Sequence, residues 1–386
     1  MSEDATVIKP VHRGNWIKRL IRGLRRVRFR PRLLLMIFSR KGFFMRTIIA
    51  TVLFFFVAPT LDAAEKLSDK FALPTFKLPM VQKGLLQKGK TAPVGDVGKK
   101  VEVDKERLIK TVHFLSEEVF PRTANAENKE KTIDYISTAF ARAGLDATRD
   151  DQRIEIGLRD RLFTNIHALK KGKTDRRIVV AAHYDTVPQS PGADDNASGV
   201  AVLIELAHLL KNAELNCDIE FVSYDAEETG FLGSWHHAGT LKKQKIDVVC
   251  MLCLDLVGYY SDEENSQKFP IPGMNLIYGN KGDFLGMTGR LQDARLIADA
   301  KKVFRKTSTL RIESIAAPKD LEGPLSLSDH RSFWNEGFSA LFFTDTAFYR
   351  NMNYHKETDT WDTLDYDRMV QVAVGLYHVI LMIDGR

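Results

Sequence analysis

The feature that most constrains the fold of this 386-residue chain is a set of four short apolar runs separated by helical patterns. The runs are RIVVAA, DIEFVSY, DVVCMLCL and FSALFFT, and they begin at Arg177, Asp218, Asp247 and Phe338. Continuous apolar runs of this length are typical of strands that are buried on both faces. Between the first two runs, apolar residues recur on one helical face over residues 200–210. The alternation predicts an α/β fold, with a mostly parallel central sheet flanked by helices.

The same pattern predicts a single globular domain over residues 104–386. KERLIKTVHFLSEEV and KEKTIDYISTAFARAGL place apolar residues at helical spacing, and Gly144 is expected to stop the second helix. We find neither an internal repeat nor a second core in this range. Residues 65–103 are rich in Lys, Gly and Pro and lack a sustained period, which predicts a linker.

The first 64 residues differ from the rest of the chain in charge. Residues 1–46 contain 13 Lys and Arg and 2 acidic residues, so they contribute +11 to the net charge of +6 and leave about −5 for the remainder. The apolar stretch 47–58 is twelve residues long, which suits a signal-peptide core and is shorter than the ~20 residues of a spanning helix. We therefore predict that residues 1–64 form a basic arm with a signal peptide or a signal anchor.

This prediction places the protein outside the cytoplasm. The expected location is periplasmic or extracellular, with attachment to the membrane if the apolar segment stays uncleaved. We expect no nucleic-acid partner, because the basic residues directly precede the apolar stretch, as in membrane-targeting segments.

Acidic residues and histidines follow the predicted strands at their carboxyl ends. His183 and Asp185 follow the first strand, Glu227 and Glu228 follow the second, and Asp255 ends the third. Ligands bind at this edge of an open α/β sheet. The residues of this group are therefore expected to lie close together.

Two further elements add donors to this edge. Asp194 and Asp195 lie in the loop before the predicted helix, and His355 lies in the loop after the fourth strand. Singly, each has a structural explanation, such as an aspartate that caps a helix. Asp255 is harder to explain in this way, because an unpaired charge at the end of an apolar strand is costly. Together, converging acids and histidines predict a metal site.

The remaining candidate ligands are interpreted as structural. The three cysteines are odd in number and form no disulfide framework, so they are expected to be buried core thiols. Within residues 104–386, six histidines stand apart from the acidic motifs and are assigned no functional role: those at positions 113, 167, 208, 236, 237 and 378.

Six motifs occur in order between about residues 104 and 382: AHYD, PGADDNASG, DAEETGFLGS, LDLVG, SDHRSF and YHKETDTWDTLD. With these motifs the chain resembles the co-catalytic dizinc aminopeptidases of metallopeptidase family 28. The resemblance implies a phosphorylase/hydrolase-like zinc exopeptidase fold and two Zn²⁺ ions per chain. It also implies a metallo-aminopeptidase that hydrolyses the N-terminal peptide bond of peptides with a free N-terminus.

The resemblance also implies a set of metal ligands. Asp195 would bridge the two metal ions. His183 and Asp255 would complete one site, and Glu228 and His355 would complete the other.

Further roles follow from the same motifs. Asp185 would orient the imidazole of His183, and Glu227 would be the general base that takes a proton from the attacking water. Tyr354 matches an oxyanion donor of some family members, with a packing role as the alternative. Asp329 and His330 would support the metal loop without a catalytic role.

Three other functions are considered on the same fold. A single-zinc glutaminyl cyclase is less favoured, because both His183 and Asp255 are retained. A non-catalytic peptide-binding relative is less favoured, because every ligand position is filled. A carboxypeptidase is compatible with the same motifs.

Overall fold

A computed structural model describes residues 100–123, 128–156, 159–270 and 272–386 of the chain. The predicted basic arm and signal segment, and almost all of the predicted linker, lie outside the described residues. Within the described ranges, no helix is both long and apolar enough to cross a membrane.

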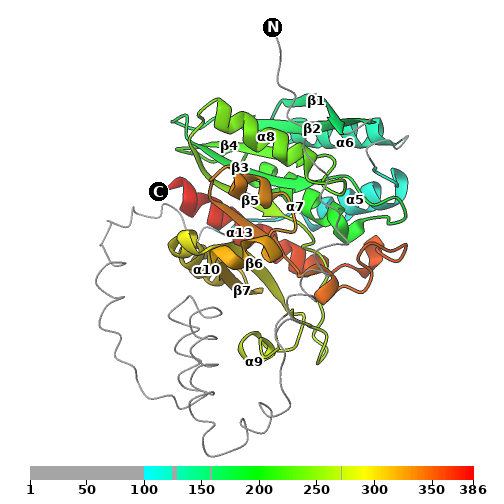
Figure 1. Cartoon of the computed structure of the whole chain (residues 1–386), viewed down its shortest axis with the longest axis vertical. Coiled ribbons are helices and arrows are strands. Elements are labelled where there is room, and N and C mark those ends of the chain that lie inside the picture. The colour runs from blue at the N-terminus through cyan, green and yellow to red at the C-terminus, as the bar shows by residue number, and fades with distance from the viewer. Residues whose placement is uncertain (1–99, 124–127, 157–158, 271) are drawn as a thin grey trace, which may run out of the picture.

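The described strands form one mixed sheet in the order β1-β2-β4-β3-β5-β8-β6-β7 (Figure 1). They are β1 (Ala147–Ile156), β2 (Arg159–Lys170), β3 (Arg177–His183), β4 (Asp218–Tyr224), β5 (Val248–Leu254), β6 (Phe284–Arg290), β7 (Arg311–Ala317) and β8 (Ala340–Thr344). The four predicted strands are β3, β4, β5 and β8, which run parallel at the centre of the sheet. This confirms the predicted α/β fold with a parallel centre.

The other four strands were not predicted. β1 and β2 form an antiparallel hairpin at one edge, and β2 pairs antiparallel with β4. β6 pairs antiparallel with β8 and parallel with β7 at the other edge. The complete sheet is therefore mixed, with the parallel part confined to its centre and to the β6–β7 pair.

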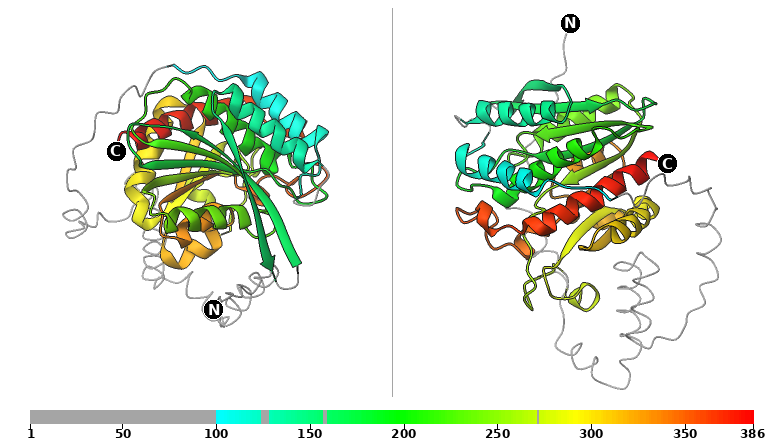
Figure 2. Two further views of the ribbon diagram at one scale, coloured as in Figure 1. Left: turned by 90° about the horizontal axis from the view of Figure 1, so that it is seen from above. Right: turned by 180° about the vertical axis from the view of Figure 1, so that it is seen from behind.

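Helices cover both faces of the sheet (Figures 1 and 2). One face packs against α5, α6, α7, α10 and α13, whereas α8 and α12 pack on the opposite face. The helices are α5 (Lys105–His113), α6 (Lys129–Arg142), α7 (Gly199–Leu210), α8 (Leu232–Lys243), α9 (Asn275–Tyr278), α10 (Ala294–Thr307), α11 (Lys319–Leu325), α12 (His330–Asn335) and α13 (Tyr366–Asp384).

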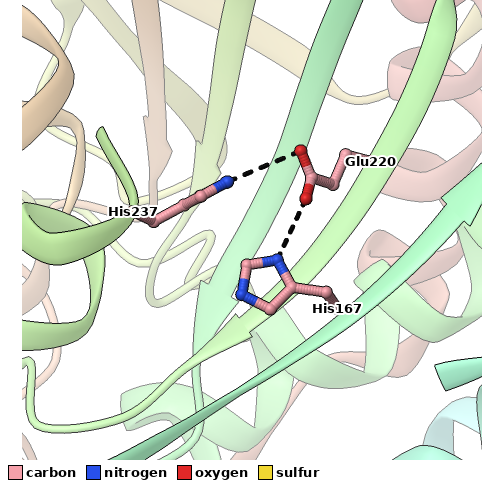
Figure 3. Close-up of side chains that lie close together, drawn as sticks. All are labelled: His167, Glu220 and His237. Atoms are coloured by element: carbon pink, nitrogen blue, oxygen red, sulfur yellow. Dashed lines mark hydrogen bonds and ion pairs between the residues drawn. The ribbon is translucent and has the colours of Figure 1, made fainter. Parts of the chain in front are cut away.

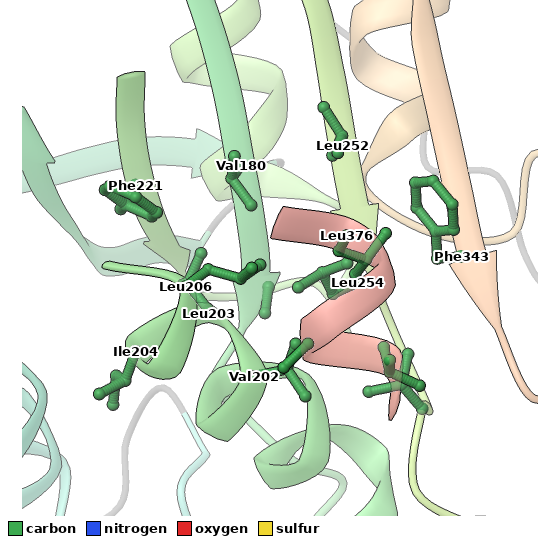
Figure 4. Packing of buried hydrophobic residues seen from close by; sticks show 14 of the residues in the cluster. Val180, Val202, Leu203, Ile204, Leu206, Phe221, Leu252, Leu254, Phe343 and Leu376 are labelled. Atoms are coloured by element: carbon green, nitrogen blue, oxygen red, sulfur yellow. The ribbon is translucent and has the colours of Figure 1, made fainter. Parts of the chain in front are cut away.

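Alternate side chains of the central strands enter two different cores. Val180 and Leu252 join the larger core with α7 and α13 (Figure 4), whereas Val179 and Met251 join the smaller core with α8 and α12. Burial of one such side chain contributes ~1.5–3 kcal/mol. Burial on both faces explains why these strands are continuous apolar runs. The three cysteines are buried and form no disulfide, as predicted.

Local sequence signals set several helix ends. The Asp104 carboxylate accepts a 3.0 Å hydrogen bond from the Arg107 N–H and caps α5. Asp365 caps α13 in the same way, through the N–H of Arg368 at 2.9 Å. Gly144 has φ +81° and follows the end of α6, as expected for a helix stop in the left-handed region.

Candidate metal centre

The predicted ligands converge because the central strands are parallel. His183 is the last residue of β3, and Asp255 follows β5 directly. Glu228 lies in the turn after β4, and His355 lies in the loop after β8. Parallel strands bring these carboxyl ends to one edge of the sheet. Asp195 reaches the same edge from the kinked segment Ala193–Ser198, which leads into α7 and in which the backbone of Asp195 is non-helical (φ −107°, ψ 86°).

Two groups of donors share Asp195. The Nε2 atom of His183 lies 3.3 Å from Asp195 Oδ1 and 3.2 Å from Asp255 Oδ1. The Nε2 atom of His355 lies 3.0 Å from Asp195 Oδ2 and 2.9 Å from Glu228 Oε1. The two oxygens of one carboxylate therefore face two different imidazoles.

These distances fit a metal of the zinc type. A tetrahedral zinc ion with bonds of ~2.0–2.2 Å holds its ligand atoms about 3.4 Å apart. The observed separations of 2.9–3.3 Å are close to this value. Imidazole and carboxylate donors also suit zinc. Asp195 and Asp255 are only 4% and 5% exposed, and carboxylates at such depth need a cation or a proton beside them.

The electrostatics of the ligands point the same way. Burial opposes the charge of Asp195, but the hydrogen bonds from His183 and His355 hold its pKa well below the usual range. Burial likewise opposes the charge of His183, but Asp255 and the neighbouring aspartates raise its pKa well above the usual range. Without a metal ion, the positive charge that these carboxylates require is supplied by protonated imidazoles. A metal cation between the same groups would supply that charge instead.

Asp185 organises the turn that carries the two glutamates. Its Oδ1 accepts a 3.0 Å hydrogen bond from the N–H of Glu227, and its Oδ2 accepts a 3.1 Å bond from the N–H of Glu228. The same Oδ1 lies 3.4 Å from Nδ1 of His183. One carboxylate therefore connects the end of β3 to the turn after β4.

Glu227 lies beside the ligands but belongs to neither group of donors. Its side chain is buried, and burial raises its pKa well above the usual range. The nearby negative charges of Glu228 and Asp255 act in the same direction, whereas His183 opposes them. A buried carboxyl group that is not a ligand is suited to receive and release a proton.

Tyr354 packs directly on a ligand. Its ring stacks on the imidazole of His355, with 3.8 Å between ring centroids and an angle of 18° between the planes. Burial raises the pKa of its phenol, and the charges of Asp195 and Glu228 add to this shift. The hydroxyl therefore stays protonated and can donate a hydrogen bond.

Three non-glycine residues at this edge have left-handed backbone conformations. They are Ala226 with φ +58°, Leu256 with φ +56° and His355 itself with φ +60°. Ala226 precedes Glu227 and Leu256 follows Asp255. Such conformations cost about 1–3 kcal/mol each and persist where surrounding contacts impose them, often at functional sites.

Asn196, which was not predicted as a site residue, clamps two loops together. Its Nδ2 donates to the carbonyl of Leu254 at 2.9 Å. Its Oδ1 accepts from the N–H of Gly199 at 3.1 Å and from that of Leu256 at 3.2 Å. A side chain at Gly199 would collide with this amide, because a Cβ there would lie 2.3 Å from Oδ1. The start of α7 is thereby joined to the end of β5.

Asp359 and Arg122 support the same loop and were also not predicted. The two oxygens of Asp359 accept the N–H groups of Asp194 at 3.0 Å and of Asp195 at 3.1 Å. Arg122 is fully buried and donates to backbone carbonyls around the loop, including that of Gly192 at 2.7 Å. Asp359 lies within the quoted motif YHKETDTWDTLD, whereas no motif marks Arg122.

Asp194, Asp329 and His330 lie behind the ligands. Asp194 accepts from the N–H of Gly258 at 2.9 Å and belongs to no donor group. Burial raises the pKa of Asp329 to about 7. His330 stacks on Phe342, 4.4 Å between centroids, and its contacts are with the surrounding protein.

Comparison with known proteins identifies the family. The model described as Peptidase family M28 matches residues 165–380, more than half of the chain. The chain belongs to this peptidase family. The chain is also 36% identical over 285 residues to the uncharacterized protein YfbL of Escherichia coli K12, which covers 70% of this chain and 86% of YfbL.

A second similar protein is named an aminopeptidase. The chain is 40% identical over 143 residues to aminopeptidase YwaD of Bacillus subtilis, which covers 35% of this chain and 30% of YwaD. The match thus spans less than a third of that relative.

Solved structures of M28-type fold confirm the architecture. The zinc aminopeptidase BSAP from Bacillus subtilis has a TM-score of 0.60 at 17% identity, covering 73% of this chain and 96% of that one. A glutaminyl cyclase from Fimbriiglobus ruber has a TM-score of 0.55 at 20% identity, covering 74% and 97%. At these identities the likeness shows the shared fold.

Proposed function

We propose that this M28 peptidase is a zinc-dependent aminopeptidase that binds two zinc ions and removes the N-terminal residue of peptides. The observation that carries the proposal is the arrangement of Asp195, whose two oxygens face His183 and His355 at 3.3 and 3.0 Å. Asp255 and Glu228 supply a second carboxylate to each imidazole. Each donor group thus contains the nitrogen and oxygen ligands of one zinc ion.

Zinc supplies Lewis acidity, which polarises a peptide carbonyl and lowers the pKa of a water molecule. In the proposed reaction the Glu227 carboxylate takes the proton of the attacking water and gives it to the leaving amine. Burial favours the protonated form of Glu227, so the carboxyl group can hold this proton between the two transfers. Asp185 holds the N–H of Glu227 and so positions this base.

Tyr354 is proposed to donate its hydroxyl hydrogen to the oxyanion. Its ring is fixed against His355, which limits where the hydroxyl can lie. A donor that is already in place lowers the barrier more than one that must be ordered during the reaction.

The nearest alternatives are a single-zinc glutaminyl cyclase and a carboxypeptidase. The likeness to a cyclase structure makes the first a specific rival. The presence of both complete donor groups favours the two-metal enzyme. A non-catalytic peptide-binding role is disfavoured, because Glu227 is present as well as every proposed ligand.

The test is a peptide panel with the full chain in the presence of zinc. It contains one peptide in three forms: with a free N-terminus, with an acetylated N-terminus, and with N-terminal glutamine. We expect release of the first residue only from free N-termini. Equal cleavage of the acetylated form would remove the aminopeptidase proposal. Cyclisation of glutamine without hydrolysis would favour the cyclase, and release of C-terminal residues would favour the carboxypeptidase.

We also propose that the protein is exported, with the basic flank and the apolar stretch 47–58 as the signal. The test is a fusion of residues 45–64 to a reporter that is active only in the periplasm. An active reporter is expected, and fractionation of the fusion would separate a cleaved signal from a membrane anchor. An inactive reporter with normal expression would count against export by this segment.

A further inference from the structure

A second cluster of metal-type donors lies on the face of the sheet that α8 covers. It consists of His167 on β2, Glu220 on β4 and His237 on α8 (Figure 3). The three side chains come from positions up to seventy residues apart in the chain. The figure shows both imidazoles directed at the two oxygens of one carboxylate.

The distances in this cluster match those expected for ligands of one ion. Nδ1 of His167 lies 3.0 Å from Glu220 Oε1, and Nε2 of His237 lies 3.5 Å from Glu220 Oε2. Tetrahedral zinc ligands are about 3.4 Å apart. The two rings meet edge to face with 4.7 Å between centroids, and one ligand atom from each of the three residues lies within 4.8 Å of the other two.

A tyrosine fixes the orientation of one imidazole. The hydroxyl of Tyr224 forms a 2.8 Å hydrogen bond with Nδ1 of His237. Tyr224 and Glu220 lie four residues apart on β4 and therefore point to the same face. A bond at Nδ1 directs Nε2 of His237 toward Glu220, which is how outer partners orient metal-binding histidines.

The second imidazole has a spare nitrogen. Nε2 of His167 is buried and has no hydrogen-bond partner among the described residues. Its closest charged neighbour is Asp150, whose Oδ2 lies 3.9 Å away, beyond hydrogen-bond distance. With Nδ1 bound to a cation, the proton of the ring would sit on Nε2 and face this carboxylate.

We propose that His167, Glu220 and His237 bind a divalent transition metal such as zinc, at a site separate from the peptidase centre. Two imidazoles and one carboxylate are a known set of zinc ligands. The cluster borders a cavity of about 230 Å³ that Thr240 and Gln244 also line. This cavity has room for a water molecule or an external group as a fourth ligand.

One neighbouring cation bears on this site. Nη1 of Arg177 lies 3.1 Å from Glu220 Oε2, the oxygen that faces His237. Arg177 also faces Asp218 at 3.7 Å, so its charge is shared between two carboxylates. The other oxygen of Glu220, Oε1, faces His167, whereas the ion pair with Arg177 is formed by Oε2. Oε1 would therefore be the carboxylate oxygen that remains available to the metal.

The proposed ion would join three elements of the fold. β2 belongs to the edge hairpin, β4 to the parallel centre, and α8 to the covering layer. Asp195 and the other peptidase ligands lie at or beyond the carboxyl ends of the strands, whereas Glu220 lies inside β4. We therefore expect this ion to stabilise the edge hairpin and to leave peptide hydrolysis largely unchanged.

The test compares the full chain with His167→Gln and His237→Gln, and with His236→Gln as a matched control. His236 lines the same cavity and is not part of the donor group. Each protein is stripped with a chelator, equilibrated with the same free zinc concentration and analysed for zinc per chain by mass spectrometry. Circular dichroism checks folding, and the melting temperature is recorded with and without zinc.

We expect His167→Gln and His237→Gln to contain about one zinc ion less per chain than the unmodified chain and His236→Gln. We also expect a smaller rise of their melting temperature on zinc addition. Equal zinc content in all four proteins would overturn the proposal and leave a hydrogen-bonded network. If His237→Gln fails to fold, the zinc content of His167→Gln tests the proposal alone. This variant is expected to fold, because the His167 side chain is 14% exposed and glutamine can still donate a hydrogen bond to Glu220. The readout is metal content, so it holds whether or not the chain is an aminopeptidase.

Discussion

Replacement of Glu227 by glutamine separates catalysis from metal binding. Glutamine keeps the size of the side chain and one acceptor oxygen, but it cannot take a proton at neutral pH. The N–H of residue 227 is held by Asp185 at 3.0 Å, and this bond does not involve the side chain that changes. The turn should therefore keep its conformation in the variant.

The expected magnitude follows from the position of this side chain. Glu227 is 3% exposed and lies outside both donor groups, so its loss removes proton transfer without removing a ligand. Loss of a general base reduces turnover by ~10²- to 10⁴-fold, which corresponds to about 3–5 kcal/mol in the barrier. We expect the fall in kcat with little change in KM, because Glu227 is proposed to act after the substrate binds.

Glu228→Gln is the matched variant. Glu228 Oε1 lies 2.9 Å from His355 Nε2, within the second donor group. Removal of its charge should weaken metal binding, so zinc content should fall and activity should depend on added zinc.

The assay measures kcat, KM and zinc content for both variants, with one peptide that has a free N-terminus. Two results would contradict the assignment. If Glu227→Gln loses zinc and Glu228→Gln keeps it, the roles of the two residues are reversed. If Glu227→Gln folds, binds zinc and turns over at the unmodified rate, Glu227 is not the base.

Three further predictions concern stability and metal affinity. Asp185→Asn leaves the N–H group of Glu227 or of Glu228 without its acceptor. We therefore expect a loss of ~1–3 kcal/mol in unfolding free energy and weaker zinc binding. Urea unfolding with and without zinc measures both effects. Chelation should lower the melting temperature, and zinc at a hundred times its Kd should restore ~2.7 kcal/mol for each ion that binds the folded state. Calorimetry that shows no shift would argue against a metal bound to the folded state. Burial lowers the pKa of His330 to about 3, so its contribution to stability is complete above about pH 6.5 and is lost as the pH falls. When the pH of metal-free protein falls from 6.5 to 4, the free energy of unfolding should therefore decrease by about 3 kcal/mol less in His330→Phe than in the unmodified chain. Urea titrations that show equal decreases in the two proteins would contradict this.

The central strands could be predicted because burial on both faces leaves a strong pattern. The runs that became β3, β4, β5 and β8 are mostly apolar, since each face packs on a different core. The edge strand β1 has the sequence ATRDDQRIEI, which is mostly polar and carries no such pattern. Its strand conformation comes from the ten-residue pairing with β2 in the hairpin, which the composition of β1 does not indicate.

The candidate peptidase ligands could be predicted because they are tied to those strands. Each follows a parallel strand or the loop that such a strand feeds, and the sheet edge brings them together. Arg122 and Asn196 could not be found in this way. They act through backbone carbonyls and N–H groups of the loops, and backbone partners leave no mark on the sequence.

The second cluster was missed for a related physical reason. His167 and His237 were interpreted as structural because they stand apart from the acidic motifs in the sequence. They meet at Glu220 because β2 pairs antiparallel with β4 in the register that sets Leu169 opposite Glu220, and because α8 crosses that face. β2 was not predicted as a strand, so the neighbour of Glu220 across the sheet was unknown. A donor set that depends on the β2–β4 pairing becomes visible only once the register of β2 is known. The proposed function of this cluster therefore depends on the metal analysis of His167→Gln.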